Sequence, residues 1–511
     1  MLIQNMLQVS AKNTPEKNAI WYKGTWTTYY DLDMKSDSLA WNLIKLGVSR
    51  GDRVALLLEN SPEYAIAFFA VLKAGAIAVP LNTGSSSDEL SVLLNHCEAK
   101  LMIMHKKYGQ ILARSSKTTS LKIIITDDKS DFLPDSELEI KELYELFSTD
   151  VSGPPSVSTI DIDPACIIYT SGSTGQPKGV MLSHLNMVSN TRSIVEYLTI
   201  TSDDRIMVVL PFYYVYGKTL LLTHVFCGAS IVIDNRFSYP NQVLNTMEAL
   251  DVTGFAGVPS TYMILLSKST LRERKFSFLR YVTQAGGAMA PAVQKQVAEV
   301  FAPAKLVVMY GATELSPRLT YVPPDMLDRK WGSIGIPIPN CEAYVSDENG
   351  IRLSPDMEGE VVGRGSNVMM GYYRDPEATS RVVRNGLYFT GDRGYMDKDG
   401  YIFVVGRSSD MLKIGGRRVS AREIEDALLS LGFIEEAAVI GISDEILGEA
   451  ARAFIVLNKN CRHNEIQIKK ELARTLPLYK IPTVISIKMT LPKNEAGKIL
   501  KAELKKPELG N

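Results

Sequence analysis

Short apolar runs that alternate with longer helical stretches restrict this sequence to an α/β fold. Between Asp52 and Leu81 the sequence reads DRVALLL, then SPEYAIAFFAVLKAGA, then IAVPL. Ser61 can cap the intervening helix, Pro62 suits its first turn and Gly75 can end it. The segment is therefore predicted to form one strand–helix–strand unit.

The same pattern continues beyond this first unit. We predict further strands at 101–104, 122–126, 166–169, 230–233 and 305–310, and helices at 241–250 and 291–301. Apolar runs of this length between helices are typical of buried strands. We therefore predict largely parallel sheets covered by helices.

The pattern changes after about residue 406. Ser420 and Glu423 have the spacing of a capping box at the start of a helix. Strands are predicted near 437–442, 451–457 and 484–489, with a helix near 464–476. This last part is predicted to be a small, separate α+β domain.

Composition excludes several classes of protein. The chain has 511 residues, of which 45% are hydrophobic, and 56 Lys+Arg against 57 Asp+Glu give a net charge of -1. This balance favours neither nucleic acid nor an anionic membrane as a partner. The longest apolar segment, from Tyr64 to Leu81, is broken by Lys73 and Gly75, so we expect no membrane span. The five cysteines and five histidines lack metal-ligand spacing, and a cytoplasmic enzyme is expected.

A loop rich in Ser, Thr and Gly follows the predicted strand at 166–169. It reads YTSGSTGQPKGV from Tyr169 to Val180. Backbone N–H groups and hydroxyls in such a loop can surround phosphates, and Lys178 adds a compact positive charge. The loop is not a Walker A motif, because Lys178 is followed by Gly179 rather than by Ser or Thr. A P-loop NTPase is therefore excluded.

This string resembles the signature phosphate loop of the adenylate-forming superfamily, which includes acyl-CoA synthetases, nonribosomal adenylation domains and luciferases. Further motifs follow in the order of that superfamily. They are YGATE at 310–314, GSIG at 332–335, YFTGD at 388–392, GR at 406–407, KIGG at 413–416 and PKNEAGK at 492–498. The resemblance spans nearly the whole chain. It implies an α/β fold with a large N-terminal domain of stacked mixed sheets and flanking helices, residues 1–407. It also implies a small mobile α+β C-terminal domain, residues 408–511, with a hinge near residue 409.

The resemblance implies that the enzyme activates a carboxylic acid with ATP, releases pyrophosphate and passes the acyl group to a thiol. Several negative charges meet in that reaction, so cations and backbone donors are required. The implied ATP- and AMP-binding residues are Thr170, Ser171, Ser173, Thr174, Lys178, Gly287, Ala288, Met289, Tyr310, Gly311, Asp392 and Arg407. Thr313 is expected at the α-phosphate and Glu314 at Mg²⁺, and Asp392 with Arg407 at the ribose hydroxyls.

The C-terminal part carries the implied catalytic lysine, Lys498, which would bridge the substrate carboxylate and the α-phosphate. We favour it over Lys493 and Lys501. The implied hinge residue is Ser409, where the family commonly has Asp or Lys. Rotation about this hinge would place Lys413, Gly415 and Gly416 beside a thiol tunnel.

The acyl pocket is expected around LPFYYVYG at 210–217. Tyr214 stands where many family members have a histidine, and it does not titrate near neutral pH. The pocket residues expected from the resemblance are Phe212, Tyr213, Tyr214, Val258, Ala285 and Met309. Residues 210–217 contain no acid that could pair with an ammonium group, which disfavours an amino acid substrate. An aryl acid or an acid of medium length is expected.

Three functions stay open at this point. The first is an acid–thiol ligase that uses ATP, Mg²⁺ and coenzyme A. The second is an adenylation enzyme that loads the phosphopantetheine of an acyl carrier protein. The third is a catalytically silent nucleotide-binding protein, which the joint presence of Lys498, Glu314, Asp392 and Arg407 disfavours.

Overall fold

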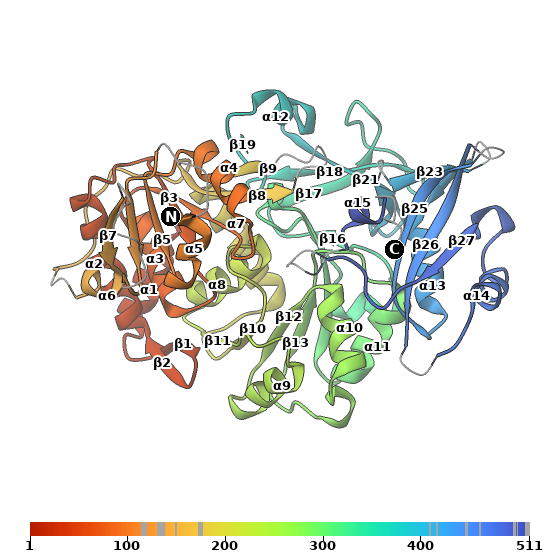
Figure 1. Cartoon of the computed structure of the whole chain (residues 1–511), viewed down its shortest axis with the longest axis horizontal. Helices are drawn as coiled ribbons and strands as arrows, with labels where there is room; N and C mark the ends of the chain where they lie inside the picture. Colours follow the sequence, from red (N-terminus) through yellow and green to blue (C-terminus); the bar gives the residue numbers. More distant parts are fainter. Residues whose placement is uncertain are drawn as a thin grey trace.

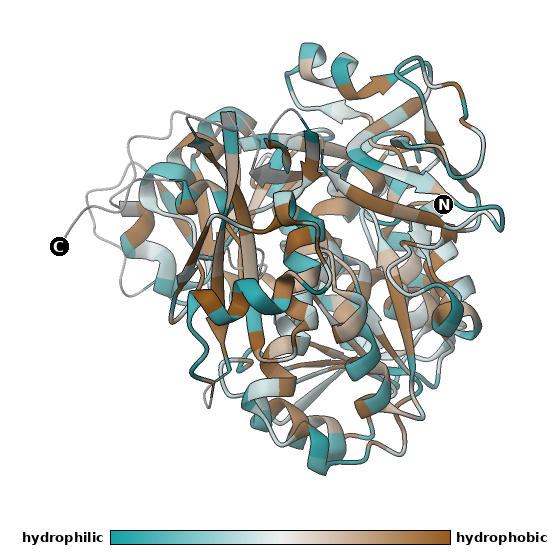
Figure 2. Ribbon diagram, turned by 90° about the vertical axis from the view of Figure 1, so that its right-hand side faces the viewer, coloured by the Kyte–Doolittle hydropathy of each residue, from teal (hydrophilic) through white to brown (hydrophobic). Residues whose placement is uncertain are grey.

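A computed structural model of the chain shows four β-sheets with helices packed against them (Figure 1). It describes residues 1–113, 120–129, 138–148, 151–171, 177–407, 410–414, 417–444, 448–458, 461–493, 497 and 499–505. Hydrophobic residues concentrate on the strands in the interior, and hydrophilic residues on the peripheral helices and loops (Figure 2). The predicted α/β class is confirmed.

The first sheet has eight strands and contains the predicted strand–helix–strand unit. Its order is β19 (Gly371–Tyr372), β9 (Pro177–Ser183), β8 (Pro164–Ser171), β4 (Ile77–Pro80), β3 (Arg53–Leu57), β5 (Leu101–Met104), β6 (Ile123–Thr126) and β7 (Glu139–Glu142). Strands β3 and β4 pair in parallel and are joined by α3 (Pro62–Lys73). The Ser61 hydroxyl accepts from the Tyr64 N–H at the start of α3, as the sequence predicted.

The second sheet has nine strands and is parallel from β10 to β14. Its order is β16 (Ile336–Pro337), β15 (Thr320–Tyr321), β14 (Lys305–Tyr310), β13 (Tyr281–Gln284), β12 (Gly254–Gly257), β10 (Arg205–Val208), β11 (Ser230–Ile233), β1 (Asn18–Tyr22) and β2 (Thr25–Thr28). The predicted strands at 230–233 and 305–310 are β11 and β14. The connecting helices are α9 (Pro240–Ala249), α10 (Pro259–Lys268) and α11 (Pro291–Phe301).

The largest hydrophobic core joins strands of these two sheets through the helices between them. The helices are α1 (Gln4–Asn13), α2 (Tyr29–Lys45), α3, α7 (His184–Leu198) and α8 (Val215–Cys227). Helices α3 and α8 are buried along most of their length. Smaller helices lie at the edges of the molecule: α4 (Ser87–Cys97), α5 (Gly109–Ala113), α6 (Leu143–Leu146) and α12 (Pro376–Val382).

The third sheet differs from the prediction, because its strands pair only in antiparallel fashion. It contains β17 (Cys341–Ser346), β18 (Gly359–Gly365), β21 (Leu387–Met396), β20 (Val383–Arg384) and β22 (Ile402–Arg407). Strands β21 and β22 are joined by a short turn that contains Gly400, whose φ is +86°. A turn of this length can connect only antiparallel neighbours.

The fourth sheet belongs to the C-terminal part. It contains β24 (Arg417–Ser420), β23 (Met411–Ile414), β26 (Gly448–Leu457), β25 (Ile434–Asp444) and β27 (Val484–Ile487), with α13 (Ala421–Ser430), α14 (Glu465–Leu472) and α15 (Lys501–Leu504). Figure 1 shows this sheet at one side of the molecule, with α13 near α11. The predicted capping box at Ser420 is wrong. Ser420 is buried beside β22, and its hydroxyl donates to the Val405 carbonyl at 2.5 Å instead.

Within the described ranges, no helix is both long enough and apolar enough to cross a bilayer. All five cysteines are free thiols.

Candidate functional site

The predicted phosphate loop connects β8 to β9. The two strands form an antiparallel hairpin in which Thr170 is paired with Lys178. The Lys178 Nζ lies 5.0 Å from the centroid of the Tyr372 ring, which belongs to β19. Ser173 and Thr174 lie outside the described residues, and of Ser171 only the backbone is described.

Thr313 and Glu314 follow β14 in a short 3₁₀ turn, Thr313–Leu315. The Tyr372 hydroxyl donates to Glu314 Oε1 at 2.8 Å. Lys178 and Glu314 therefore approach the same tyrosine from two different strand ends. Burial raises the pKa of Tyr372, and the Glu314 carboxylate raises it further.

This arrangement fits a nucleotide bound with Mg²⁺. A lysine for phosphate oxygens and a carboxylate for a hard cation contact the same tyrosine. Among the described residues there is no group of three or more His, Cys, Asp or Glu side chains placed to hold a metal. Mg²⁺ commonly takes one or two carboxylates together with phosphate oxygens and water, and Glu314 could supply one of them.

Asp392 and Arg407 face each other across β21 and β22. Arg407 Nε donates to Asp392 Oδ1 at 3.0 Å, and the Tyr310 hydroxyl donates to Asp392 Oδ2 at 2.5 Å. Burial raises the pKa of Tyr310, and Asp392 adds to the rise, so this hydroxyl keeps its proton. The Asp392 carboxylate is held by two donors in a position where ribose hydroxyls could also reach it.

Gly311 lies in the sequence between Tyr310, which donates to Asp392, and the turn that carries Thr313. A Cβ at Gly311 would lie 1.9 Å from the Pro317 carbonyl oxygen, so only glycine fits between the end of β14 and the backbone at Pro317.

The segment from Gly287 to Met289 follows β13. Gly287 and Ala288 are exposed, and the Gly287 carbonyl accepts from the Gln284 side chain at 2.8 Å. Met289 is buried in a second hydrophobic core, so its side chain points away from the exposed stretch. The backbone of Gly287 and Ala288 is therefore the part that can lie against an adenine ring.

The predicted acyl-pocket residues fall into two groups. Tyr214 and Val258 both lie near Gly286: a Cβ there would be 3.7 Å from the Tyr214 hydroxyl and 3.0 Å from Val258 Cγ1. Ala285 is buried beside them, and Tyr213 is half-buried. Phe212 instead packs on Tyr64, with ring centroids 5.4 Å apart, inside the large core.

A small cavity of about 10 Å³ lies beside Tyr216. Its wall includes Met309, one of the predicted acyl-pocket residues, and also Tyr216, Thr283, His224 and Arg318. Arg318 was missed, although its signal was present, because it is a charged residue inside the otherwise uncharged run LSPRLTYV.

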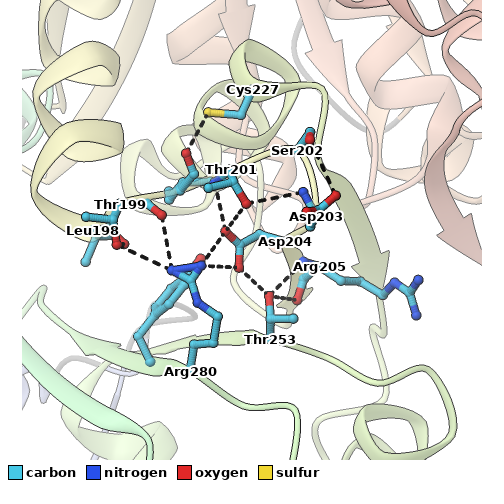
Figure 3. A network of polar contacts seen from close by, with 12 residues as sticks. Leu198, Thr199, Thr201, Ser202, Asp203, Asp204, Arg205, Cys227, Thr253 and Arg280 are labelled. Atoms are coloured by element: carbon cyan, nitrogen blue, oxygen red, sulfur yellow. Dashed lines mark hydrogen bonds and ion pairs between the residues drawn. The ribbon is translucent and has the colours of Figure 1, made fainter.

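Asp204 shows how this fold holds a buried charge (Figure 3). Its carboxylate accepts from Arg280 at 3.0 Å, from the Thr253 hydroxyl at 2.7 Å and from the Thr201 N–H at 2.8 Å. The network connects the segment before β10 to β12 and β13.

The C-terminal segment reaches the large domain. A Cβ at Gly497 would lie 2.1 Å from Ser260 Oγ and 3.2 Å from Val258 Cγ2, so the residue before Lys498 is in close contact with the start of α10. Lys498 itself lies outside the described residues, as do Ser409, Gly415 and Gly416. Lys413 is exposed on β23, and its N–H donates to Glu449 Oε2 at 2.6 Å.

Comparison with known proteins explains why these motifs occur together. The family model for AMP-binding enzymes matches residues 7–373, and the model for the AMP-binding enzyme C-terminal domain matches residues 423–498. The chain belongs to the AMP-binding enzyme family. It is an enzyme of the adenylate-forming superfamily, an acid–thiol ligase, as the ordered motifs predicted.

Three relatives illustrate the likeness. A long-chain-fatty-acid–CoA ligase of Bacillus subtilis is 31% identical over 535 residues, which cover 100% of this chain and 95% of the relative. A crystal structure of an anthranilate–CoA ligase with anthranoyl-AMP has a TM-score of 0.90 at 25% identity and covers 99% of this chain and 96% of that chain. The o-succinylbenzoate–CoA synthetase of Bacillus subtilis, in complex with ATP and magnesium, has a TM-score of 0.82 at 28% identity and covers 98% of this chain and 99% of that chain.

This AMP-binding enzyme acts on a small-molecule carboxylic acid and uses ATP, Mg²⁺ and coenzyme A.

Proposed function

We propose that this enzyme forms its acyl-adenylate between the ends of β14, β21 and β22 and the C-terminal segment, and then transfers the acyl group to coenzyme A. The observation that carries this proposal is the contact of Gly497 with Ser260 and Val258. It brings the residue next to Lys498 to the place where Tyr214, Val258 and Gly286 meet.

In the first step, the substrate carboxylate attacks the α-phosphorus of ATP and pyrophosphate leaves. Thr170, Lys178 and the loop residues Ser171, Ser173 and Thr174 bind the β- and γ-phosphates. Mg²⁺ would neutralise phosphate charge beside Glu314. Asp392 and Arg407 hold the ribose, and the exposed backbone at Gly287 and Ala288 lies against adenine. Fixed donors and cations around the reacting phosphate lower the cost of moving charge there.

Lys498 is proposed to neutralise the carboxylate and the α-phosphate as they approach each other. Its two lysine neighbours are engaged elsewhere. Lys493 Nζ lies 2.5 Å from Glu436 Oε1, and Lys501 Nζ lies 2.7 Å from Glu425 Oε1. The two pairs hold the C-terminal segment on β25 and on α13 of its own domain, which supports Lys498 as the lysine that enters the site.

For the second step we propose that residues 408–511 rotate about Ser409 and bring Lys413, Gly415 and Gly416 to a tunnel for the thiol. Replacement of Lys413 by Ala is then expected to slow thioester formation more than adenylation. Rates of the two half-reactions, measured separately, check this, and an equal loss in both would contradict the rotation.

Coenzyme A is the acceptor that we favour over an acyl carrier protein. The relatives differ in their acids, which are a long-chain fatty acid, anthranilate and o-succinylbenzoate, but all three are named as coenzyme A ligases or synthetases. We place the reaction in the cytoplasm, where free cysteines are ordinary.

The deciding experiment is acid-dependent ATP–pyrophosphate exchange over a panel of aryl, aliphatic and amino acids, followed by thioester formation with coenzyme A. We expect exchange with at least one acid and turnover with coenzyme A. Exchange without coenzyme A turnover would favour a carrier protein, and a lack of exchange with every acid would contradict the proposed adenylation.

A further inference from the structure

The cavity beside Tyr216 is lined from several elements of the large domain. Helix α7, helix α8 and strands β10, β13 and β14 contribute side chains to it. Its volume of about 10 Å³ is room for roughly one water molecule. Long alkyl chains therefore need a large rearrangement of its wall, whereas a compact group needs a small one.

Arg318 forms the charged part of this wall and is 3% exposed. Its guanidinium stacks 4.0 Å from the centroid of the Tyr216 ring, and its Nε donates to Met309 Sδ at 3.4 Å. Within the described part of the chain, no carboxylate forms an ion pair with Arg318. Its partners are the ring and hydroxyl of Tyr216, the hydroxyl of Tyr197 and the Met309 thioether, all of them uncharged.

The backbone of Arg318 is fixed firmly. Its carbonyl accepts from the side-chain amides of Asn190 at 2.9 Å and Asn367 at 2.7 Å, and both asparagines are fully buried. The guanidinium is therefore held at the cavity by the fold, and it does not lie there as the end of a mobile surface side chain.

Other buried cations of this chain avoid an uncompensated charge. Lys73 has two carboxylate partners, Asp33 and Asp37, at 2.6 and 2.5 Å. Lys218 has none among the described residues, but burial lowers its pKa to about 7, so it can lose its proton. Arginine cannot become neutral in this way. Since a buried charge with only uncharged partners is costly, a carboxylate supplied by a ligand would stabilise Arg318.

Neighbours in the sequence connect the cavity wall to the nucleotide side. Met309 lies in the wall and is followed by Tyr310 and Gly311 at the nucleotide side. Arg318, also in the wall, follows the short turn that carries Thr313 and Glu314. Burial raises the pKa of Tyr214, Arg318 opposes this rise and Glu314 adds to it. An acid whose reacting carboxylate is near Thr313 could therefore extend past Met309 toward Arg318.

We propose that Arg318 binds a second carboxylate on the acyl part of the substrate, so that the preferred acid is a compact dicarboxylic acid. This inference rests on the proposed function and names its substrate class. The cavity wall contains no Asp or Glu, so an ammonium group at the same place would meet only the positive charge of Arg318.

The test compares matched pairs of acids in the ATP–pyrophosphate exchange assay: glutarate with pentanoate, and isophthalate with benzoate. The wild-type enzyme is expected to favour the dicarboxylic member of a pair by roughly 10- to 100-fold in kcat/KM, the range for a charge-assisted hydrogen-bonded pair. Exchange with the monocarboxylic acids but not with the dicarboxylic acids would overturn the inference and leave the proposed adenylation intact.

Two variants locate the effect at Arg318. Arg318→Met is expected to remove the preference mainly by raising KM for the dicarboxylic acid, with KM for ATP unchanged, and Arg318→Lys to retain part of it. Arg384→Met is the matched control, because Arg384 also stacks on an aromatic ring, 3.6 Å from the centroid of Phe389, but is exposed and outside the cavity. An unchanged preference in Arg318→Met would assign Arg318 a structural role only.

A binding measurement covers the case in which Arg318→Met does not fold. Stabilisation of the wild-type enzyme against heat, in the presence of ATP and Mg²⁺, is expected to be larger with glutarate than with pentanoate at equal concentration. Equal stabilisation by both acids, or none by either, would overturn the inference.

Discussion

On the nucleotide side of the site, Arg407 lies beside the Asp392 carboxylate, whereas on the acyl side Arg318 lies beside an aromatic ring and a thioether. On the nucleotide side Arg407 is thus paired with a carboxylate of the protein, and on the acyl side Arg318 is not. We interpret this difference by the ligands of the two sides. The nucleotide side always binds ATP, whereas on the acyl side the acid substrate supplies the charge partner of Arg318.

Among the substitutions considered, loss of Lys498 is expected to reduce the rate of adenylation most. Lys498→Ala should reduce acid-dependent ATP–pyrophosphate exchange by about 10³-fold, because the lysine acts on the charge that moves during the reaction. The affinity for ATP should be nearly unchanged, as measured by equilibrium titration. Lys493→Ala serves as the control, since Lys493 is paired with Glu436 and should leave exchange close to wild type. Wild-type exchange in Lys498→Ala would remove this residue from the adenylation step.

The two buried lysines test whether pairing itself matters for stability. Lys73→Met leaves Asp33 and Asp37 without their common partner and should lower the free energy of unfolding by about 3 kcal/mol. Among the described residues, the Lys218 ammonium contacts the Tyr64 hydroxyl and the faces of Tyr64 and Phe68 but no carboxylate, so Lys218→Met should be neutral or stabilising. Thermal melting of both variants checks this. A similar loss in both would contradict the distinction between paired and unpaired cations.

The sequence predicted the nucleotide side far better than the acyl side, and the reason is physical. Phosphates and ribose impose the same donors and carboxylates at fixed spacing, so Lys178, Glu314, Asp392 and Arg407 stand in recognisable strings. The acyl wall is built from side chains of separate strands and helices, so Phe212, which reads as a pocket residue, packs in the core with Tyr64.

The fold, like the acyl side, could be predicted from the sequence only where local patterns determine it. Buried strands such as β5 and β14 were located by their apolar runs, because a strand covered on both faces has a continuous hydrophobic sequence. The antiparallel sheet of β17, β18, β21 and β22 was not foreseen, because pairing partners depend on the turns and not on apolar runs. The Ser420 cap failed because a tertiary partner, the Val405 carbonyl, took its hydroxyl.

Asp392→Asn sharpens the comparison from the nucleotide side. The variant keeps the shape but loses the charge that faces Arg407 and the ribose, so KM for ATP is expected to rise by about 10- to 100-fold. KM for the acid should stay within a few-fold of wild type. Tyr310→Phe is the milder companion, since it removes one donor to the same carboxylate and should cost roughly 1 kcal/mol. A change in acid preference in Asp392→Asn would show that the two sides are not independent.

The smallest expected effect is a pH dependence of stability that comes from Lys218. Burial lowers its pKa in the folded protein to about 7, against an ordinary value of 10.5, so between these values the unfolded chain binds one proton more. Stability should therefore rise with pH above about 7, by up to roughly 1.4 kcal/mol per pH unit. Burial raises the pKa of the neighbouring Cys166 to about 11 and that of Tyr64 above its ordinary value, so neither titrates between pH 7 and 9. Melting temperatures of wild type and Lys218→Met across that range isolate the contribution, because other groups cancel in the difference. Parallel curves for the two proteins would mean that Lys218 stays protonated when buried, and the large core would then hold an unpaired cation beside Tyr64 and Phe68.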